Sequence, residues 1–220
     1  MRASGRPELR RRHARLLAGG ALVAALLGGC GPSGPLGKLP AGVERSELNV
    51  LLITLDTTRA DRIGAYARPR GLEAPATPRL DALAARGTRF DNAVSVTPLT
   101  LPAHCTLMTG LLPAAHGVRD NGGFRLDPAR RTLAEAFAAA GFRTGGFVSA
   151  YVLDHKWGIG QGFERYFDDF DLAKVKTSNM GEIQRRGDET VARATAWIDE
   201  VAPAGRFFAW IHLYDPHTPY

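Results

Sequence analysis

An almost uninterrupted apolar run, Asn49-Val50-Leu51-Leu52-Ile53-Thr54-Leu55, sets the strongest limit on what this chain folds into. A strand that is apolar at successive positions is buried on both faces, which is typical of a parallel sheet covered by helices. The run therefore predicts a buried central strand of such a sheet. Asp56 follows it directly, at the strand end where open α/β sheets bind ligands. A carboxylate there suits a hard divalent cation, although Asp56 taken alone fits a loop or cap residue equally well.

Helical and strand patterns alternate along the rest of the chain. Helices are predicted at Thr77–Gly87, with Thr77 as the cap, at 133–141 and at Asp188–Val201; strands are predicted at 88–93, 142–149 and 206–213. Because the two patterns alternate, we expect an α/β fold with a mostly parallel central sheet and helices on both faces.

The stretch from Thr97 to Gly117 is predicted to be a loop that runs into a short helix. Thr100 precedes Leu101 and Pro102, so it is expected to be the N-cap of that helix. A helix N-terminus favours a bound oxyanion such as sulfate or phosphate. His104 lies one turn further on the same helix face, so it is expected to reach the same anion.

This motif, Thr100-Leu101-Pro102-Ala103-His104 followed by Thr109-Gly110, resembles the nucleophile motif of the sulfatases, within the alkaline phosphatase superfamily. The usual form is Cys or Ser-x-Pro-x-Arg, so the resemblance places Thr100 at the nucleophile position and His104 at the arginine position. Sulfatases convert their Cys or Ser to formylglycine, whereas related phosphodiesterases and phosphatases use an unmodified Thr or Ser. Cys105 lacks the modification signal and is expected to be a buried apolar residue.

The resemblance also implies a metal site. Sulfatases usually have two adjacent aspartates where this chain has Asp56 and Thr57. The resemblance therefore implies one or two divalent cations whose ligands include Asp56, Thr57 and Thr100. The family favours calcium, and zinc or manganese are alternatives that are compatible with a threonine nucleophile.

Two further segments carry implied substrate contacts. His155-Lys156-Trp157-Gly158 resembles the family's Gly-Lys-Trp-His-Leu-Gly, whose Lys and His contact the sulfate and leaving group. The resemblance thus implies that Lys156 contacts the anion. Gly158 stands at the position of the family's histidine, and His155 is an alternative residue that could take over the role of that histidine. Asp215-Pro216-His217 resembles the Pro-His-x-Pro segment whose His faces the substrate, which implies His217 as a site residue.

The first 30 residues have the pattern of an export signal. Six arginines against one acid give them a net charge of +5, so of the chain's +6 only +1 belongs to residues 31–220. The body thus has no basic excess that would favour nucleic acid binding. A short apolar stretch ends at Leu27-Gly28-Gly29-Cys30, which resembles a bacterial lipobox with Cys30 lipidated. Residues 31–46 are predicted to be a flexible tether between a membrane anchor and the domain at residues 47–220.

Together these patterns predict an exported, lipid-anchored envelope hydrolase of sulfate or phosphate esters. Its substrate would be an anionic ester, such as a sulfated or phosphorylated glycan or small molecule. Complete sulfatase-like domains run roughly twice as far, so the chain is expected to be the N-terminal part of one, with the C-terminal part and its remaining metal ligands missing. Two alternatives stay open: a non-catalytic envelope lipoprotein that keeps the fold, and a transferase of phosphate-containing groups.

Overall fold

A computed structural model describes residues 42–44, 47–74, 76–172 and 179–217. The chain divides into two units, Met1–Ser46 and Glu47–Tyr220, and the description below concerns the second. Cys30, the predicted export signal and nearly all of the predicted tether lie outside the described residues. Within the described part, no helix is long and apolar enough to cross a membrane.

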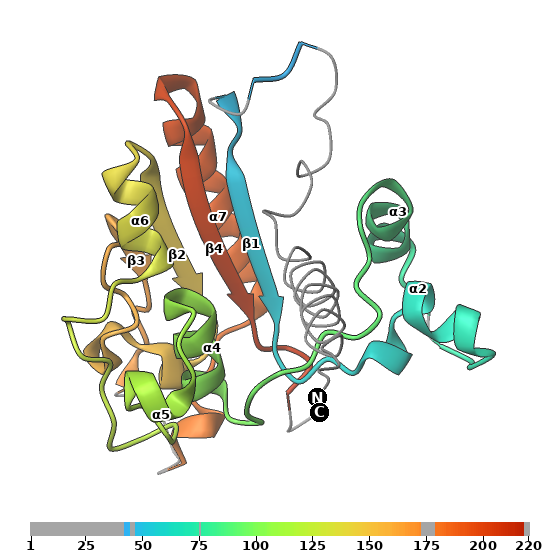
Figure 1. Cartoon of the computed structure of the whole chain (residues 1–220), viewed down its shortest axis with the longest axis horizontal. Coiled ribbons are helices and arrows are strands. Elements are labelled where there is room, and N and C mark those ends of the chain that lie inside the picture. Colours follow the sequence, from blue (N-terminus) through green and yellow to red (C-terminus); the bar gives the residue numbers. More distant parts are fainter. Residues whose placement is uncertain (1–41, 45–46, 75, 173–178, 218–220) are drawn as a thin grey trace, which may run out of the picture. The chain divides into compact units, whose positions relative to one another are not determined.

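The second unit is built on a parallel sheet with the strand order β1-β4-β2-β3 (Figure 1). The strands are β1 (Val50–Leu55), β2 (Arg143–Val148), β3 (Arg165–Phe167) and β4 (Phe207–Leu213). All three pairings between neighbouring strands are parallel. The predicted α/β fold with a mostly parallel sheet is therefore confirmed. Because the strands are parallel, all four carboxyl ends lie at one edge of the sheet.

Successive side chains of β4 point to opposite faces of the sheet, and both faces are covered by helices. Phe207, Ala209 and Ile211 pack with the helix α7 (Gly187–Val201). The intervening residues, Phe208 and Trp210, pack into a second cluster on the opposite face. That cluster holds side chains of α4 (Thr100–Thr109) and α6 (Leu133–Ala139), so helices lie on both faces as expected.

The shorter elements connect these layers. They are η2 (Ala60–Arg62), α2 (Gly64–Ala67), η3 (Arg68–Arg70), α3 (Pro78–Arg86), α5 (Pro113–His116), η4 (Tyr151–Leu153), η5 (His155–Trp157), η7 (Met180–Glu182) and η8 (Ala202–Ala204).

The prediction of a buried central strand at Asn49–Leu55 is wrong for the described residues. β1 is the end strand of the sheet, and Leu51 and Ile53 are each 50% exposed. Alternate residues Val50 and Leu52 do pack on the core, because they lie on the face that α4 and α6 cover. An apolar run indicates that both faces are suited to burial, but it does not determine the strand's place in the sheet.

The region between β1 and α4 also differs from the prediction. The helix at Thr77–Gly87 is confirmed as α3, with Thr77 and Gly87 as its flanking residues. The strand predicted at 88–93 is absent from this described stretch, and Phe90 is 70% exposed. Without a neighbouring strand to pair with, this short segment remains an irregular connection.

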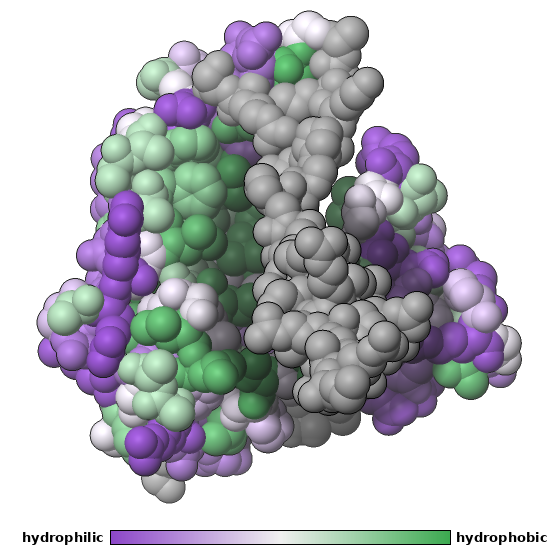
Figure 2. All heavy atoms as spheres, in the orientation of Figure 1, coloured by the Kyte–Doolittle hydropathy of each residue, from purple (hydrophilic) through white to green (hydrophobic). Residues whose placement is uncertain are grey.

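Figure 2 shows apolar side chains gathered over the face that carries α4 and α6. Leu107 on α4 and Leu112 just beyond it are among the exposed large apolar residues. This face adjoins the end of the sheet where the candidate site lies.

Candidate active site

Two neighbouring strands end with polar side chains that meet. In the parallel register Thr54 lies beside His212 and Leu55 beside Leu213, and the Asp56 amide donates to the Leu213 carbonyl at 2.9 Å. This pairing brings His212 Nε2 to 3.3 Å from Asp56 Oδ2. Both side chains are buried. Sequence reasoning missed His212; the available signal was a lone histidine next to the last position of an apolar strand.

The helix α4 brings Thr100 and His104 to the same place. Leu101, Cys105 and Met108 form its apolar stripe in the core, and this packing turns Thr100 and His104 toward the strand ends. Leu99 is the N-cap, so the expectation that Thr100 caps the helix is wrong: Thr100 is its first residue. The Leu101 amide donates to Asn121 Oδ1 at 2.8 Å, so a loop side chain satisfies part of the helix N-terminus.

Cys105 is fully buried, and burial raises the pKa of its thiol to about 12. The thiol therefore stays protonated at neutral pH and is a poor nucleophile, as expected for a core residue.

A cavity of about 410 Å³ unites the predicted site residues of the two segments. The lining includes Asp56, Thr57, Thr100 and His104. Sequence-distant residues from the end of β1 and the start of α4 therefore line one open pocket. We call it the Thr100 cavity.

Opposing effects act on the charge of Asp56. Burial alone would raise the pKa of its carboxyl, but the hydrogen bond with His212 and the electrostatic interaction with that ring lower it, with smaller contributions from His104 and the Thr100 hydroxyl. The net effect is a pKa below the usual value, so Asp56 is a carboxylate at neutral pH. An ionised buried carboxylate beside a hydroxyl can hold a cation or accept a proton.

His104 differs in character from the arginine expected at its position. Its Nδ1 lies 2.7 Å from the Thr100 carbonyl oxygen, which only accepts, so Nδ1 carries the proton and Nε2 is left with a free lone pair. Burial and the neighbouring His212 lower the pKa of His104 to about 4. The ring is therefore neutral at pH 7 and supplies no positive charge to an anion.

Tyr214 links the end of β4 to His217. Its ring stacks on His217 with centroids 4.3 Å apart, and it is itself buried. Burial and the charge of Asp56 raise its pKa to about 12, while a hydrogen bond with Thr100 acts in the opposite direction. Tyr214 thus lies between Thr100 and His217, a connection that the sequence did not reveal.

The segment after β2 holds Lys156 against an aromatic side chain. Lys156 Nζ contacts the Tyr151 hydroxyl and lies 3.8 Å from the centre of that ring. Gly158 has a left-handed backbone (φ +82°), and a Cβ there would lie 2.6 Å from the Leu126 carbonyl oxygen. A histidine with this backbone would clash, so the position accepts the glycine that stands where the resembled motif has its histidine.

His155 instead pairs with a buried carboxylate. Its Nδ1 and its backbone amide both contact Asp168 Oδ2, at 2.7 and 2.6 Å. The hydrogen bond with Asp168 raises the pKa of His155 above 6.5.

Titration of the metal-free protein by NMR should therefore separate two of its histidines. We expect His155 to titrate above 6.5 and His104 near 4, because His155 has a carboxylate partner and His104 is buried beside another imidazole. In Asp168→Asn the pKa of His155 should fall toward its ordinary value, since the charge that favours the imidazolium is gone. An unchanged His155 pKa in that variant would contradict the pairing.

Thr57 has an unusual backbone. Its φ is +53°, the left-handed region that a β-branched residue rarely adopts. The residue directly follows Asp56 and lines the Thr100 cavity. Strained positions of this kind cluster at functional sites.

Replacing Thr57 by asparagine should stabilise the protein, because asparagine tolerates a left-handed backbone better than threonine does. We expect the free energy of unfolding to rise by about 1 kcal/mol, measured by urea denaturation. Thr58→Asn is the matched control, since Thr58 has no positive φ and its replacement should change stability little. A loss of stability in Thr57→Asn exceeding that of the control would show that the Thr57 side chain makes a net stabilising contribution.

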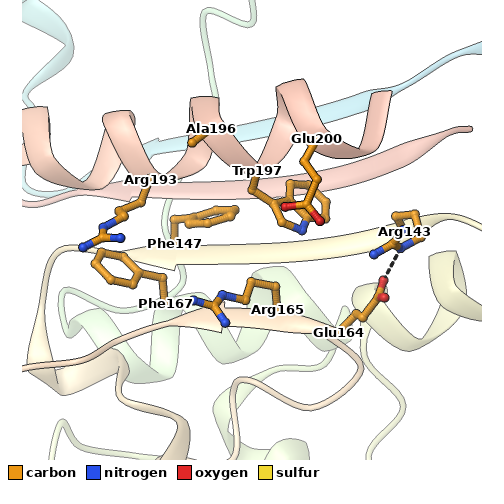
Figure 3. Close-up of a pocket in the computed structure, with 9 residues that line it drawn as sticks. All are labelled: Arg143, Phe147, Glu164, Arg165, Phe167, Arg193, Ala196, Trp197 and Glu200. Carbon is orange, nitrogen blue, oxygen red and sulfur yellow. Dashed lines mark hydrogen bonds and ion pairs between the residues drawn. The ribbon is translucent and has the colours of Figure 1, made fainter. Parts of the chain in front are cut away.

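A second cavity, of about 450 Å³, lies on the other side of the sheet. Figure 3 shows its lining: Arg143 pairs with Glu164, and Arg165 and Arg193 lie on either side of Phe167. Its floor includes Trp197 of α7. None of the predicted site residues lines it, so its size alone does not make it the centre of the chemistry.

Comparison with known proteins agrees with this geometry. The model of the sulfatase family matches residues 48–220. Arylsulfatase A of Bos taurus is 36% identical over 126 residues, which cover 54% of this chain and 22% of that protein. A solved structure described as a sulfatase, from Bacteroides fragilis, matches with a TM-score of 0.62 at 22% identity, over 82% of this chain and 46% of that one. Phosphonate monoester hydrolase of Agrobacterium radiobacter matches with a TM-score of 0.59 at 26% identity, over 78% and 41%. The chain thus spans less than half the length of these relatives.

Proposed function

The chain belongs to the sulfatase family, and on that premise we propose that it contributes the nucleophile half of a metal-dependent hydrolase of anionic esters, with Thr100 as the nucleophile. The observation that carries the proposal is the Thr100 cavity, where the hydroxyl of Thr100, the carboxylate of Asp56 and the strained Thr57 line one space. A helix N-terminus at the same point favours the anionic group of the substrate.

In the proposed reaction Thr100 Oγ attacks the sulfur or phosphorus atom of the ester in line. The bond to the leaving oxygen breaks, and water then hydrolyses the ester formed on Thr100. Asp56 holds the divalent cation, with Thr57 and Thr100 as further proposed ligands. When bound, such a cation lowers the pKa of a hydroxyl and neutralises charge on the transferred group.

His217 and Lys156 are the proposed partners of the developing charge, and His104 acts on Thr100 instead. His217 stacks on Tyr214, whose hydroxyl hydrogen-bonds with Thr100, so it is the best placed of the three to protonate the leaving oxygen. Lys156 follows the carboxyl end of β2 with its Nζ against the Tyr151 ring, and its proposed role is to contact the anionic group of the substrate. The neutral ring of His104 leaves it a positioning role through its hydrogen bond to the Thr100 carbonyl.

Two features point to different ester classes. The family as a whole favours sulfate esters, whereas an unmodified threonine favours phosphate esters. The resemblance to a phosphonate monoester hydrolase supports an ester of phosphorus. For location we propose export and lipid anchoring at Cys30, because the arginine-rich start, the short apolar stretch and the Leu-Gly-Gly-Cys sequence occur in that order.

The test is a substrate panel with the full-length protein. Nitrophenyl sulfate, nitrophenyl phosphate, a bis-nitrophenyl phosphate diester and a phosphonate monoester are each assayed with calcium, manganese and zinc. We expect metal-dependent turnover, faster for the phosphorus esters. No turnover of any ester with any of the cations would contradict the hydrolase and support the non-catalytic lipoprotein. Transfer to an added alcohol in preference to water would identify a transferase instead.

A further inference from the structure

We propose that His104 and His212, together with Asp56, are ligands of a nitrogen-binding divalent metal such as zinc, in place of an all-oxygen calcium site. The inference depends on the proposed function only in placing a cation beside Thr100. Donor atoms of these three buried residues, one from each, all lie within 4.8 Å of one another. They come from the end of β1, the first turns of α4 and the end of β4.

His104 is held in the tautomer that a metal requires. Its protonated Nδ1 donates to the Thr100 carbonyl, and Nε2 has no hydrogen-bond partner among the residues that the structure describes. Histidine ligands commonly bind metal through one nitrogen while the other donates to a carbonyl or carboxylate. Leaving a buried polar atom without a partner is costly, so the bare lone pair of His104 Nε2 is suited to a ligand-binding role.

His212 and Asp56 have the spacing of two ligands of one ion. Nε2 and Oδ2 are 3.3 Å apart, slightly longer than an ordinary N–H···O hydrogen bond. Two donors each about 2.0–2.1 Å from a tetrahedral zinc ion lie roughly 3.3 Å apart. The other nitrogen of this ring, Nδ1, is also buried without a partner in the described part of the chain. The imidazole rings of His104 and His212 meet edge to face with centroids 4.9 Å apart, so both rings adjoin the proposed metal position.

The donor chemistry selects the class of metal. Calcium takes six to eight oxygen ligands and has little affinity for imidazole. Zinc and its neighbours bind imidazole nitrogen well, and three protein ligands leave positions open for water or substrate. Two imidazoles and one carboxylate therefore fit a catalytic zinc-type site better than they fit a calcium site.

The first experiment uses the wild-type chain and needs no variant. Zinc is added to the metal-free protein while the imidazole nitrogen signals of its six histidines are followed by NMR. We expect the signals of His104 and His212 to shift together at one equivalent of zinc. If zinc leaves both signals unchanged, the proposal is overturned, whether or not zinc binds elsewhere.

The second experiment measures affinity with cobalt, whose visible absorption reports nitrogen ligands in a zinc site. His104→Gln and His212→Asn should each lower cobalt affinity at least about 100-fold, since even outer partners of metal ligands are worth 10–100-fold. Thermal unfolding followed by circular dichroism confirms that each variant is folded. A large excess of calcium should not displace the cobalt, whereas zinc should.

The matched control is His155→Ala. His155 forms a second group of possible metal ligands with Asp154 and Asp168, and its side chain is 71% exposed. If cobalt absorption is lost in His155→Ala and kept in both other variants, the metal lies at that second group and the proposal fails. Turnover supported equally by calcium, with no cobalt absorption, would overturn the nitrogen ligands and leave the ester hydrolase standing.

Discussion

Thr100→Ala in the full-length protein is expected to reduce the turnover of its best ester on the order of 10⁴–10⁶-fold, the loss that follows removal of a covalent nucleophile. Alanine removes the only atom that the proposed reaction bonds to sulfur or phosphorus. The side chain is small and adjoins a cavity, so the fold should survive the change. The measurement is kcat with a nitrophenyl ester, with circular dichroism to confirm folding.

Two variants make this result interpretable. Thr100→Ser keeps the hydroxyl and should retain a measurable fraction of the activity. Thr58→Ala removes another hydroxyl from the wall of the same cavity, one whose hydrogen bond is to the nearby Asp56 carbonyl, and should have little effect. Activity that survives in Thr100→Ala would exclude Thr100 as the nucleophile, and similar losses in Thr100→Ala and Thr58→Ala would indicate a general disturbance of the cavity.

Asp56→Asn is the second change with a large expected effect. It keeps the size of the side chain but removes the negative charge that faces both buried imidazoles. We expect metal affinity to fall at least about 100-fold, measured by competition with a metal-sensitive dye. Turnover at a fixed metal concentration should fall with it.

The matched control for this change is Asp61→Asn. Asp61 lies in the same loop, and its carboxylate pairs with Arg59 at the surface. Its loss should leave metal affinity unchanged, because a surface ion pair contributes little. Equal affinity in Asp56→Asn and the wild type would mean that the cation is held without Asp56, and the ligand set proposed here would be wrong.

The sequence predicts the fold class because that property depends on local patterns. The apolar strands at 50–55 and 207–213, and the helices α3, α6 and α7 between them, follow from spacing alone. The order of the strands does not follow from spacing, because it depends on which strands pair with one another. For this reason β1 was expected at the centre, whereas it is an end strand of the sheet that the described residues form.

The same distinction holds for the candidate site. Thr100 and Asp56 belong to short motifs, so the sequence was sufficient to select them. His212 and Tyr214 have no motif of that kind, and their importance follows from register: β4 lies beside β1, which brings His212 against Asp56. Gly158 is a further case: an added Cβ there would lie against the Leu126 carbonyl, a contact that the sequence motif does not reveal.

The pairing of β1 with β4 has a consequence for biosynthesis. Within the described residues β4 is the only strand beside β1. The Asn49 side chain and the Phe207 amide that it contacts are 158 positions apart, and Trp210 and Thr54 are 156 positions apart. Among the described strands β1 leaves the ribosome first, and it therefore waits for β4. At 5–20 residues per second that interval is roughly 8–30 s, during which an apolar segment has no native partner. Holding chaperones that bind nascent or secreted chains would be expected to recognise residues 50–55 in this interval, and the yield of folded protein should depend on them more than on the stability of the finished domain.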